Sequence, residues 1–256
     1  MPEYKVLTAG DTALVIEFGD GVNRQLSGFV LALARRIDQD RPPGVVETVP
    51  TFRSLMVHYD PLVIPATDLI AHIEALMRDL RAAEYDSRHW RLPVCYDPPL
   101  ASDLDEVASR TGLTPAQIIA RHTSVTYHVY MLGFMPGLAY MGDLPPELAL
   151  PRRQTPRSPV ATGSVAIATT MSIIFPGESP TGWYVIGRSP VPLWRRPAMG
   201  GTRDAGRTAA SGTLLAPGDK VSFAPVSLRE FEDLSALAVA GVLDVHPLNE
   251  PTGAAA

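Results

Sequence analysis

Proline is the feature of this sequence that most limits its fold, since 25 of the 256 residues are proline. This share is about 10%, roughly twice the usual one. Proline has no N–H to donate and its ring fixes φ, so it interrupts helices and the interior of sheets. This content argues against a helical bundle and favours turns, loops and edge strands.

Length and composition set the broad class of the protein. A chain of 256 residues fits one large domain or two modest ones. Hydrophobic residues make up 46% and charged residues 19%, a balance that excludes a disordered chain. The formal net charge of −5 argues against a nucleic-acid-binding protein with a broadly basic surface.

The sequence shows no sign of membrane insertion, secretion or metal binding. No apolar run reaches the roughly 18 residues of a membrane-spanning helix, and the first ten residues lack the order of a signal peptide. Cys95 is the one cysteine, which excludes an internal disulfide and a cysteine-rich zinc site. The histidines form no His-Glu-x-x-His pattern. We expect a soluble cytoplasmic protein without a metal site, binding neither nucleic acid nor membrane.

Strands and amphipathic helices alternate over residues 1–97. Apolar residues at helical spacing predict helices over 23–39 and 67–83, with Thr67 as the N-cap of the second. The expected strands are residues 4–9, 13–18, 55–59 and 90–96. This pattern predicts a small α+β domain with helices on one face of a sheet, ending at Asp97-Pro98-Pro99.

Residues 98–246 have a different pattern. Two short helices are expected first, one over 103–110 with Ser102 as its cap and one beginning at Thr114-Pro115. Short strands cut by glycine and proline then predict a β-barrel or sandwich. These strands are residues 125–132, 164–168, 173–175, 184–186, 191–194, 213–215 and 220–223. A last helix is expected over 227–240, followed by a disordered tail, 247–256.

Two stretches resemble catalytic or binding motifs but lack residues that those motifs require. Residues 201–208 nearly spell a phosphate-binding loop, but Arg207 stands in place of the lysine, and the flanking strand and helix are missing. Residues 177–181 miss the nucleophile elbow of serine hydrolases because Thr181 stands where its second glycine belongs. The first is predicted to be a surface loop, and a serine-hydrolase triad is not supported.

The stretch from His122 to Arg188 holds the remaining candidates. The loop 133–137, Gly-Phe-Met-Pro-Gly, is suited either to close approach of a ligand or another surface, or to a tight barrel corner. Arg152, Arg153 and Arg157 lie among prolines, which favours guanidinium groups held ready for carboxylate, carbamate or phosphate; a solvated basic loop is the alternative.

Three other side chains in this stretch have two readings each. Glu178 is either a base or the partner of an arginine. His122 and Tyr140 are either chemical groups or packed side chains with one satisfied polar atom. The residues alone thus predict an anion-binding, β-rich domain.

A family resemblance goes further. The segment 122–140 resembles a His…Gly-Phe-x-Pro-Gly-Phe-x-Tyr motif, and five more motif segments, 151–157, 163–167, 178–183, 186–190 and 217–223, follow in the same order. Together they resemble the KipI/PxpB family, also called allophanate hydrolase subunit 1. This family includes the B subunit of bacterial ATP-dependent 5-oxoprolinase, and its domains recur in the carboxyltransferase part of urea carboxylase. Leu138, Thr181 and Ser189 depart from the family pattern.

The resemblance implies a fold, partners and an activity. The fold would be an N-terminal ferredoxin-like α+β domain followed by a cyclophilin-like β-barrel. A KipA/PxpC-type subunit would complete the active site, and a LamB/YcsF-type subunit would join the complex. The complex would open a small lactam, 5-oxoproline, to glutamate with hydrolysis of ATP, which is used with Mg²⁺. This chain would be inactive alone.

The resemblance also implies roles for residues at matching positions. Arg153, Arg157 and Arg188 would face phosphoryl or oxyanion charge. His122 and Tyr140 would donate protons or orient groups, and Glu178 would be a base or hold an arginine. The expected substrate-binding residues are Gly133, Phe134, Pro136, Gly137, Gly163 and Ser164.

Two alternatives stay open. One is a carboxyltransferase subunit acting on urea or a related amide, which would need a separate biotin carrier because the chain has no Ala-Met-Lys-Met motif. The other is an inhibitor of a sensor histidine kinase, in which the arginine loop would be a docking surface without chemistry.

Overall fold

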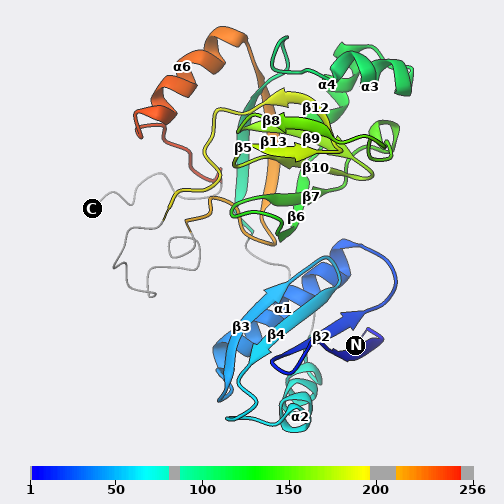
Figure 1. Cartoon of the computed structure of the whole chain (residues 1–256), viewed down its shortest axis with the longest axis vertical. Coiled ribbons are helices and arrows are strands. Elements are labelled where there is room, and N and C mark those ends of the chain that lie inside the picture. Colours follow the sequence, from blue (N-terminus) through cyan, green and yellow to red (C-terminus); the bar gives the residue numbers. More distant parts are fainter. Residues whose placement is uncertain (1, 81–86, 197–211, 249–256) are drawn as a thin grey trace. The chain divides into compact units, whose positions relative to one another are not determined.

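The chain forms two compact units, Met1–Asp86 and Ser87–Ala256, in a computed structural model that describes residues 2–80, 87–196 and 212–248 (Figure 1). The expected boundary at residue 97 differs from this division. Strand β5 (His89–Cys95) was expected in the first domain, but it pairs with strands of the second unit. The loop 201–208 and tail residues 249–256 lie outside the described residues.

The first unit is a four-stranded antiparallel sheet in the order β1-β2-β4-β3, with two helices. Leu14, Ile16 and Phe18 of the second strand are fully buried and pack in one core with Leu33 and Ile37 of the first helix. The bounds are β1 Tyr4–Thr8, β2 Ala13–Phe18, α1 Arg24–Asp40, β3 Val45–Pro50, β4 Ser54–Tyr59 and α2 Ala66–Met77. The predicted α+β layer is present.

The element order of this unit bears on the ferredoxin-like expectation. A ferredoxin-like unit runs β-α-β-β-α-β, whereas these elements run β-β-α-β-β-α. The edge strand beside β2 is β1, which comes before the first helix instead of after the second. The ferredoxin-like assignment therefore stays a prediction.

Helix starts show how local sequence sets these elements. The Asn23 side chain caps α1 by accepting the Leu26 N–H at 2.9 Å. Helix α2 begins one residue earlier than predicted, because Pro65, with extended φ and ψ, occupies the N-cap position. Thr67 therefore lies inside the first turn, and the predicted cap at this residue is wrong.

In the second unit, the described strands close into a barrel in the order β10-β7-β6-β13-β5-β12-β9. The barrel strands are β5, β6 Tyr127–Leu132, β7 Ala139–Gly142, β9 Ser164–Ala168, β10 Met171–Ile174, β12 Tyr184–Arg188 and β13 Lys220–Val226. Strands β8 (Arg157–Val160) and β11 (Ser179–Thr181) form a separate two-stranded sheet. The barrel confirms the predicted barrel domain and fits a cyclophilin-like fold.

Helices flank the barrel (Figure 1). They are α3 Leu104–Thr111, α4 Pro115–Thr123, the 3₁₀ turn η1 Pro146–Leu148 and α6 Leu228–Val239. The capping boxes at α4 (Thr114 with Gln117) and α6 (Ser227 with Glu230) fix their starts. Helix α3 is capped at Asp103, not at Ser102 as expected.

Some barrel strands, β9 and β12 among them, contribute residues to two hydrophobic clusters. In β9, Val165 and Ile167 belong to the main core with Trp90, Leu92 and other residues of the barrel interior, whereas Ala166 and Ala168 belong to a second cluster with Trp183 and Val160. Successive strand residues point to opposite faces, which explains the split. The second cluster joins the β8–β11 sheet to the outside of the barrel.

Some expected strands differ from the structure. Residues 191–194 and 213–215 contribute only an isolated bridge between Trp194 and Thr213. Strands β3, β7, β8 and β11 were not predicted, and β8 contains Pro159, which an edge position tolerates. In the described part of the chain, every helix is too short or too polar to cross a membrane.

Candidate functional site

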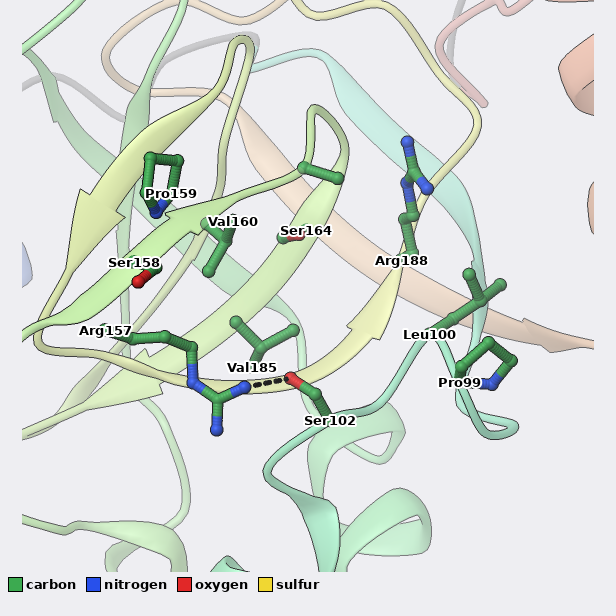
Figure 2. A pocket seen from close by; sticks show the side chains of 11 residues that line it. Pro99, Leu100, Ser102, Arg157, Ser158, Pro159, Val160, Ser164, Val185 and Arg188 are labelled. Carbon is green, nitrogen blue, oxygen red and sulfur yellow. Dashed lines mark hydrogen bonds between the residues drawn. The ribbon is translucent and has the colours of Figure 1, made fainter.

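A pocket of about 280 Å³ is lined by three segments, residues 99–102, 157–164 and 185–188 (Figure 2). Of the predicted site residues, it brings together Arg157, Ser164 and Arg188. Ser102 and Ser158 also line it and were missed, because isolated serines carry no sequence signal. The remaining wall consists of Pro99, Leu100, Pro159, Val160, Ala161 and Val185.

Arg157 is held at the pocket wall by the segment that precedes α3. Its Nη1 donates to the Ser102 hydroxyl at 3.1 Å, and its Nη2 donates to the Asp103 carboxylate. The Asp103 side chain is 1% exposed and Arg157 is 35% exposed. The predicted guanidinium preorganisation is thus present, but a carboxylate of the same chain already occupies one edge of the group.

Arg153 belongs to the same ion-pair cluster but does not line the pocket. It donates to Asp103 at 3.3 Å and to Glu106, and its guanidinium lies 5.3 Å from the ring centre of Tyr184. The hydrogen bond to Glu106 raises the pKa of Arg153. Arg153 is thus held between two carboxylates of the same chain, outside the pocket lining, so the prediction that it faces a substrate anion has no support from this geometry.

Arg188 has a different environment. Its Nε donates to the Thr162 carbonyl at 2.8 Å, and its guanidinium lies 5.8 Å from the ring centre of Phe231 in α6. No carboxylate of the described residues pairs with it. Arg188 also pairs with Cys95 in the single pairing of β12 with β5, so it lies where these two barrel strands meet.

Gly163 shapes the turn between these groups. Its φ is +84°, and a Cβ built there would lie 2.2 Å from the Ser189 carbonyl oxygen. Its N–H donates to the Phe175 carbonyl at 2.7 Å, and its own carbonyl accepts the Ser189 N–H at 2.9 Å. Gly163 is therefore a backbone spacer between Thr162, which holds Arg188, and Ser164, which lines the pocket.

His122 lies in the barrel core, away from this pocket. It is fully buried, stacks on Phe223 with ring centres 4.6 Å apart, and shares hydrogen bonds with the Tyr96 hydroxyl (2.8 Å) and Ser172 (3.0 Å). Burial lowers its pKa from 6.5 to about 3. The structure thus favours the packed reading of His122 over the predicted proton-donor role.

Tyr140 and Glu178 lie elsewhere on the barrel domain. Tyr140 points to the outer cluster, with its ring centre 6.2 Å from that of Trp183. Glu178 is exposed just before β11 and has no ion pair with a described arginine, so the arginine-holder reading has no support. Neither residue lines the pocket.

The loop 133–137 is a tight barrel corner between β6 and β7. The Gly133 N–H donates to the Leu138 carbonyl at 3.1 Å, and a Cβ on Gly137 would lie 2.9 Å from the Leu193 carbonyl oxygen. Its close approach is therefore to the chain's own backbone. Phe134, at φ +72°, and Pro136 are exposed, and no loop residue lines the pocket.

The size and chemistry of the pocket limit what it holds. Ligand pockets usually span about 300–1,000 Å³, so this one fits a small carboxylate or one phosphate group better than a whole nucleotide. No three His, Cys, Asp or Glu side chains gather as metal ligands in the described residues.

Comparisons with known proteins add three findings. Residues 4–200 match a family model described as carboxyltransferase domain, subdomain C and D. The chain is 34% identical to the B subunit of 5-oxoprolinase from Bacillus subtilis, over 89% of this chain and 95% of that protein. It is 32% identical to the solved protein TTHA0988, with a TM-score of 0.70, covering 84% of this chain and 40% of that one.

A more distant structure shares the fold. The urea amidolyase of K. lactis is 18% identical, with a TM-score of 0.74, over 95% of this chain and 16% of that one. At this identity the similarity concerns the fold alone.

Proposed function

The chain belongs to the KipI/PxpB family, and on that premise we propose that it is the B subunit of an ATP-dependent 5-oxoprolinase. One observation carries this proposal: the 34% identity to the B. subtilis protein extends over 95% of that protein. The similarity therefore includes both units of the fold. We further propose that the chain works in the cytoplasm and is inactive alone.

The proposed reaction opens a lactam ring, which is difficult at neutral pH. In the complex, one water cleaves the C–N bond of 5-oxoproline to give glutamate, while ATP is hydrolysed to ADP and phosphate. Negative charge develops on the carbonyl or phosphoryl oxygens during such steps, and fixed cations stabilise it. Arg157 and Arg188 at the pocket are the groups that this chain offers.

The pocket alone lacks several parts of such a site. Among the described residues, its lining contains no carboxylate, since Asp103 lies behind Arg157, and no group of metal ligands. We therefore assign ATP and its Mg²⁺ to a KipA/PxpC-type subunit, and we include a LamB/YcsF-type subunit in the complex. Exposed groups of this chain, such as Glu178 as a base and Phe134, would contribute at the contact with a partner.

Reconstitution tests this function. The three subunits are co-expressed and purified, and glutamate release is measured with and without ATP, 5-oxoproline and this chain. We expect release only when all are present. The same preparation without this chain is the control, and glutamate release at the full rate in that control would contradict the proposal.

A second candidate function has a specific observation behind it. The matching family model is described as a carboxyltransferase domain. This description supports a biotin-dependent carboxyltransferase subunit as the second candidate. Supplying a biotin carboxylase, its biotin carrier, bicarbonate and urea separates the two. Carboxylated urea without any glutamate from 5-oxoproline would favour this second function.

A further inference from the structure

The two arginines of the pocket differ in how their charge is balanced. Arg157 shares the Asp103 carboxylate with Arg153 and bonds Ser102 with its other nitrogen. Arg188 has a backbone carbonyl and an aromatic ring as its described partners. A carbonyl and a ring orient a guanidinium without cancelling its charge. Arg188 is therefore the cation of this pocket that has no counter-charge among the described residues.

The surroundings of Arg157 add further positive charge. Arg110, Arg153 and Arg157 pair with only two carboxylates, Asp103 and Glu106, among the described residues. Three cations against two anions leave this cluster with one net positive charge on the side of the pocket formed by Arg157. The pocket is thus flanked by unbalanced positive charge on two sides, which favours an anionic ligand.

The way Arg188 is held suits recognition of an oxyanion. Its Nε–H is used by the Thr162 carbonyl, and this bond sets the plane of the guanidinium. Four N–H groups remain on Nη1 and Nη2, and one from each nitrogen points the same way, so that this pair can bind a carboxylate or phosphate bidentately. Figure 2 places Arg188 and Arg157 on opposite sides of Ser164.

Hydroxyl groups complete the lining. Ser102, Ser158 and Ser164 also line the pocket and carry hydroxyl groups, and the volume of about 280 Å³ limits the ligand to a small one. We propose that this pocket is a binding site for a small oxyanion, a carboxylate or a single phosphate group, in which Arg188 pairs with the anion. Identifying the anion with the carboxylate of 5-oxoproline rests on the proposed function. The proposal that the pocket binds an oxyanion rests on the pocket residues alone.

Titration of the full-length chain by two-dimensional NMR tests this site. The probes are 5-oxoproline, inorganic phosphate and 2-pyrrolidinone, the same lactam without a carboxylate, each at constant ionic strength. We expect the amide signals of Ser158 and Ser164 to shift saturably with at least one of the two anions and not with 2-pyrrolidinone. Competition between the anions then shows whether carboxylate or phosphate is the preferred source.

Variants identify the cation. Arg188→Met is expected to weaken binding by tenfold or more, a loss of about 1.4 kcal/mol per decade. Arg188→Lys, which keeps the charge but not the fork, covers the case in which the Met variant does not fold, and should also weaken binding. Arg91→Met is the matched control, because Arg91 is an exposed arginine of β5 outside the pocket.

The outcomes separate this inference from the proposed function. An unchanged dissociation constant in the Arg188 variants, or no saturable shift with either anion, would overturn the oxyanion site. If the reconstituted complex still released glutamate, the proposed function would stand without it. Conversely, Arg188-dependent binding of an anion by a chain whose complex releases no glutamate would keep the site and reject the 5-oxoprolinase assignment.

Discussion

Asp103 and Val185 exchange two hydrogen bonds: the Asp103 N–H donates to the Val185 carbonyl at 2.8 Å, and the Val185 N–H donates to Asp103 Oδ2 at 2.8 Å. The register between β12 and β9 shifts between Val185 and Gly187. The residue before α3 thus pairs with β12 at this irregularity, and its other carboxylate oxygen binds Arg153 and Arg157. One buried carboxylate therefore links helix, strand and pocket wall.

Replacing Asp103 by Ala is expected to be strongly destabilising. The change leaves a buried backbone N–H without its acceptor and two guanidinium groups without a shared counter-charge. Breaking a buried pair by removing one partner costs about 3–5 kcal/mol, and the partial exposure of both arginines favours the lower end. Urea unfolding measures the loss. The control is Asp105→Asn, an exposed residue in the first turn of the same helix, expected to lose less than about 1 kcal/mol.

Arg153→Lys is expected to affect stability but not anion affinity. Lysine keeps the charge but cannot bridge Asp103 and Glu106 with one rigid fork, and Arg153 does not line the pocket. The unfolding free energy should fall by about 1–2 kcal/mol, while the dissociation constant for the oxyanion stays within about twofold. A tenfold loss of affinity in a stably folded Arg153→Lys protein would show that Arg153 contacts the ligand after all.

Local signals in the sequence predicted much of the fold. Helices start close to the expected residues 23, 114 and 227, and Thr114 is the N-cap that was predicted, because a cap acts within one turn. Alternating apolar residues predicted most of β5, and a short apolar segment predicted β9. The pairing of β5 with β13 could not be predicted in this way, since it joins Trp90 to Val221 across most of the second unit.

The candidate site shows the same limit. Sequence reasoning found Arg157, Ser164 and Arg188, but it grouped Arg153 with them because the arginines are neighbours in the chain. Their partner Asp103 lies about 50 residues away along the chain, and no spacing rule connects a carboxylate at that separation to an arginine. The sequence leaves the role of His122 open because its burial depends on the closed barrel, and composition does not reveal this closure.

Acid should destabilise the chain through His122. Burial lowers the pKa of His122 from 6.5 to about 3, so the folded state excludes a proton that the unfolded chain binds below pH 6.5. The contribution of neutral His122 to the unfolding free energy is complete above pH 6.5. It is lost as the pH falls toward 3, at up to about 1.4 kcal/mol per pH unit. Urea unfolding across this range measures the slope. His122→Gln does not titrate, so its slope should be smaller by up to this amount, and equal slopes would contradict the prediction.

Gly163→Ala should damage the pocket through the backbone. The φ of +84° disfavours any Cβ, and the added atom would meet the Ser189 carbonyl oxygen at 2.2 Å, a contact with backbone that no rotamer change relieves. Either β12 moves near Ser189 or the turn rearranges, and both displace Thr162, the residue that holds Arg188. We expect a loss of about 1–3 kcal/mol in unfolding free energy together with weaker oxyanion binding.

Gly177→Ala is the matched control, because a Cβ there meets nothing within 4 Å and its φ is not positive. This variant should match the wild-type protein in unfolding free energy and in oxyanion binding. If Gly163→Ala bound the anion as tightly as the wild type while losing stability, the turn at Gly163 would serve the barrel and not the position of Arg188.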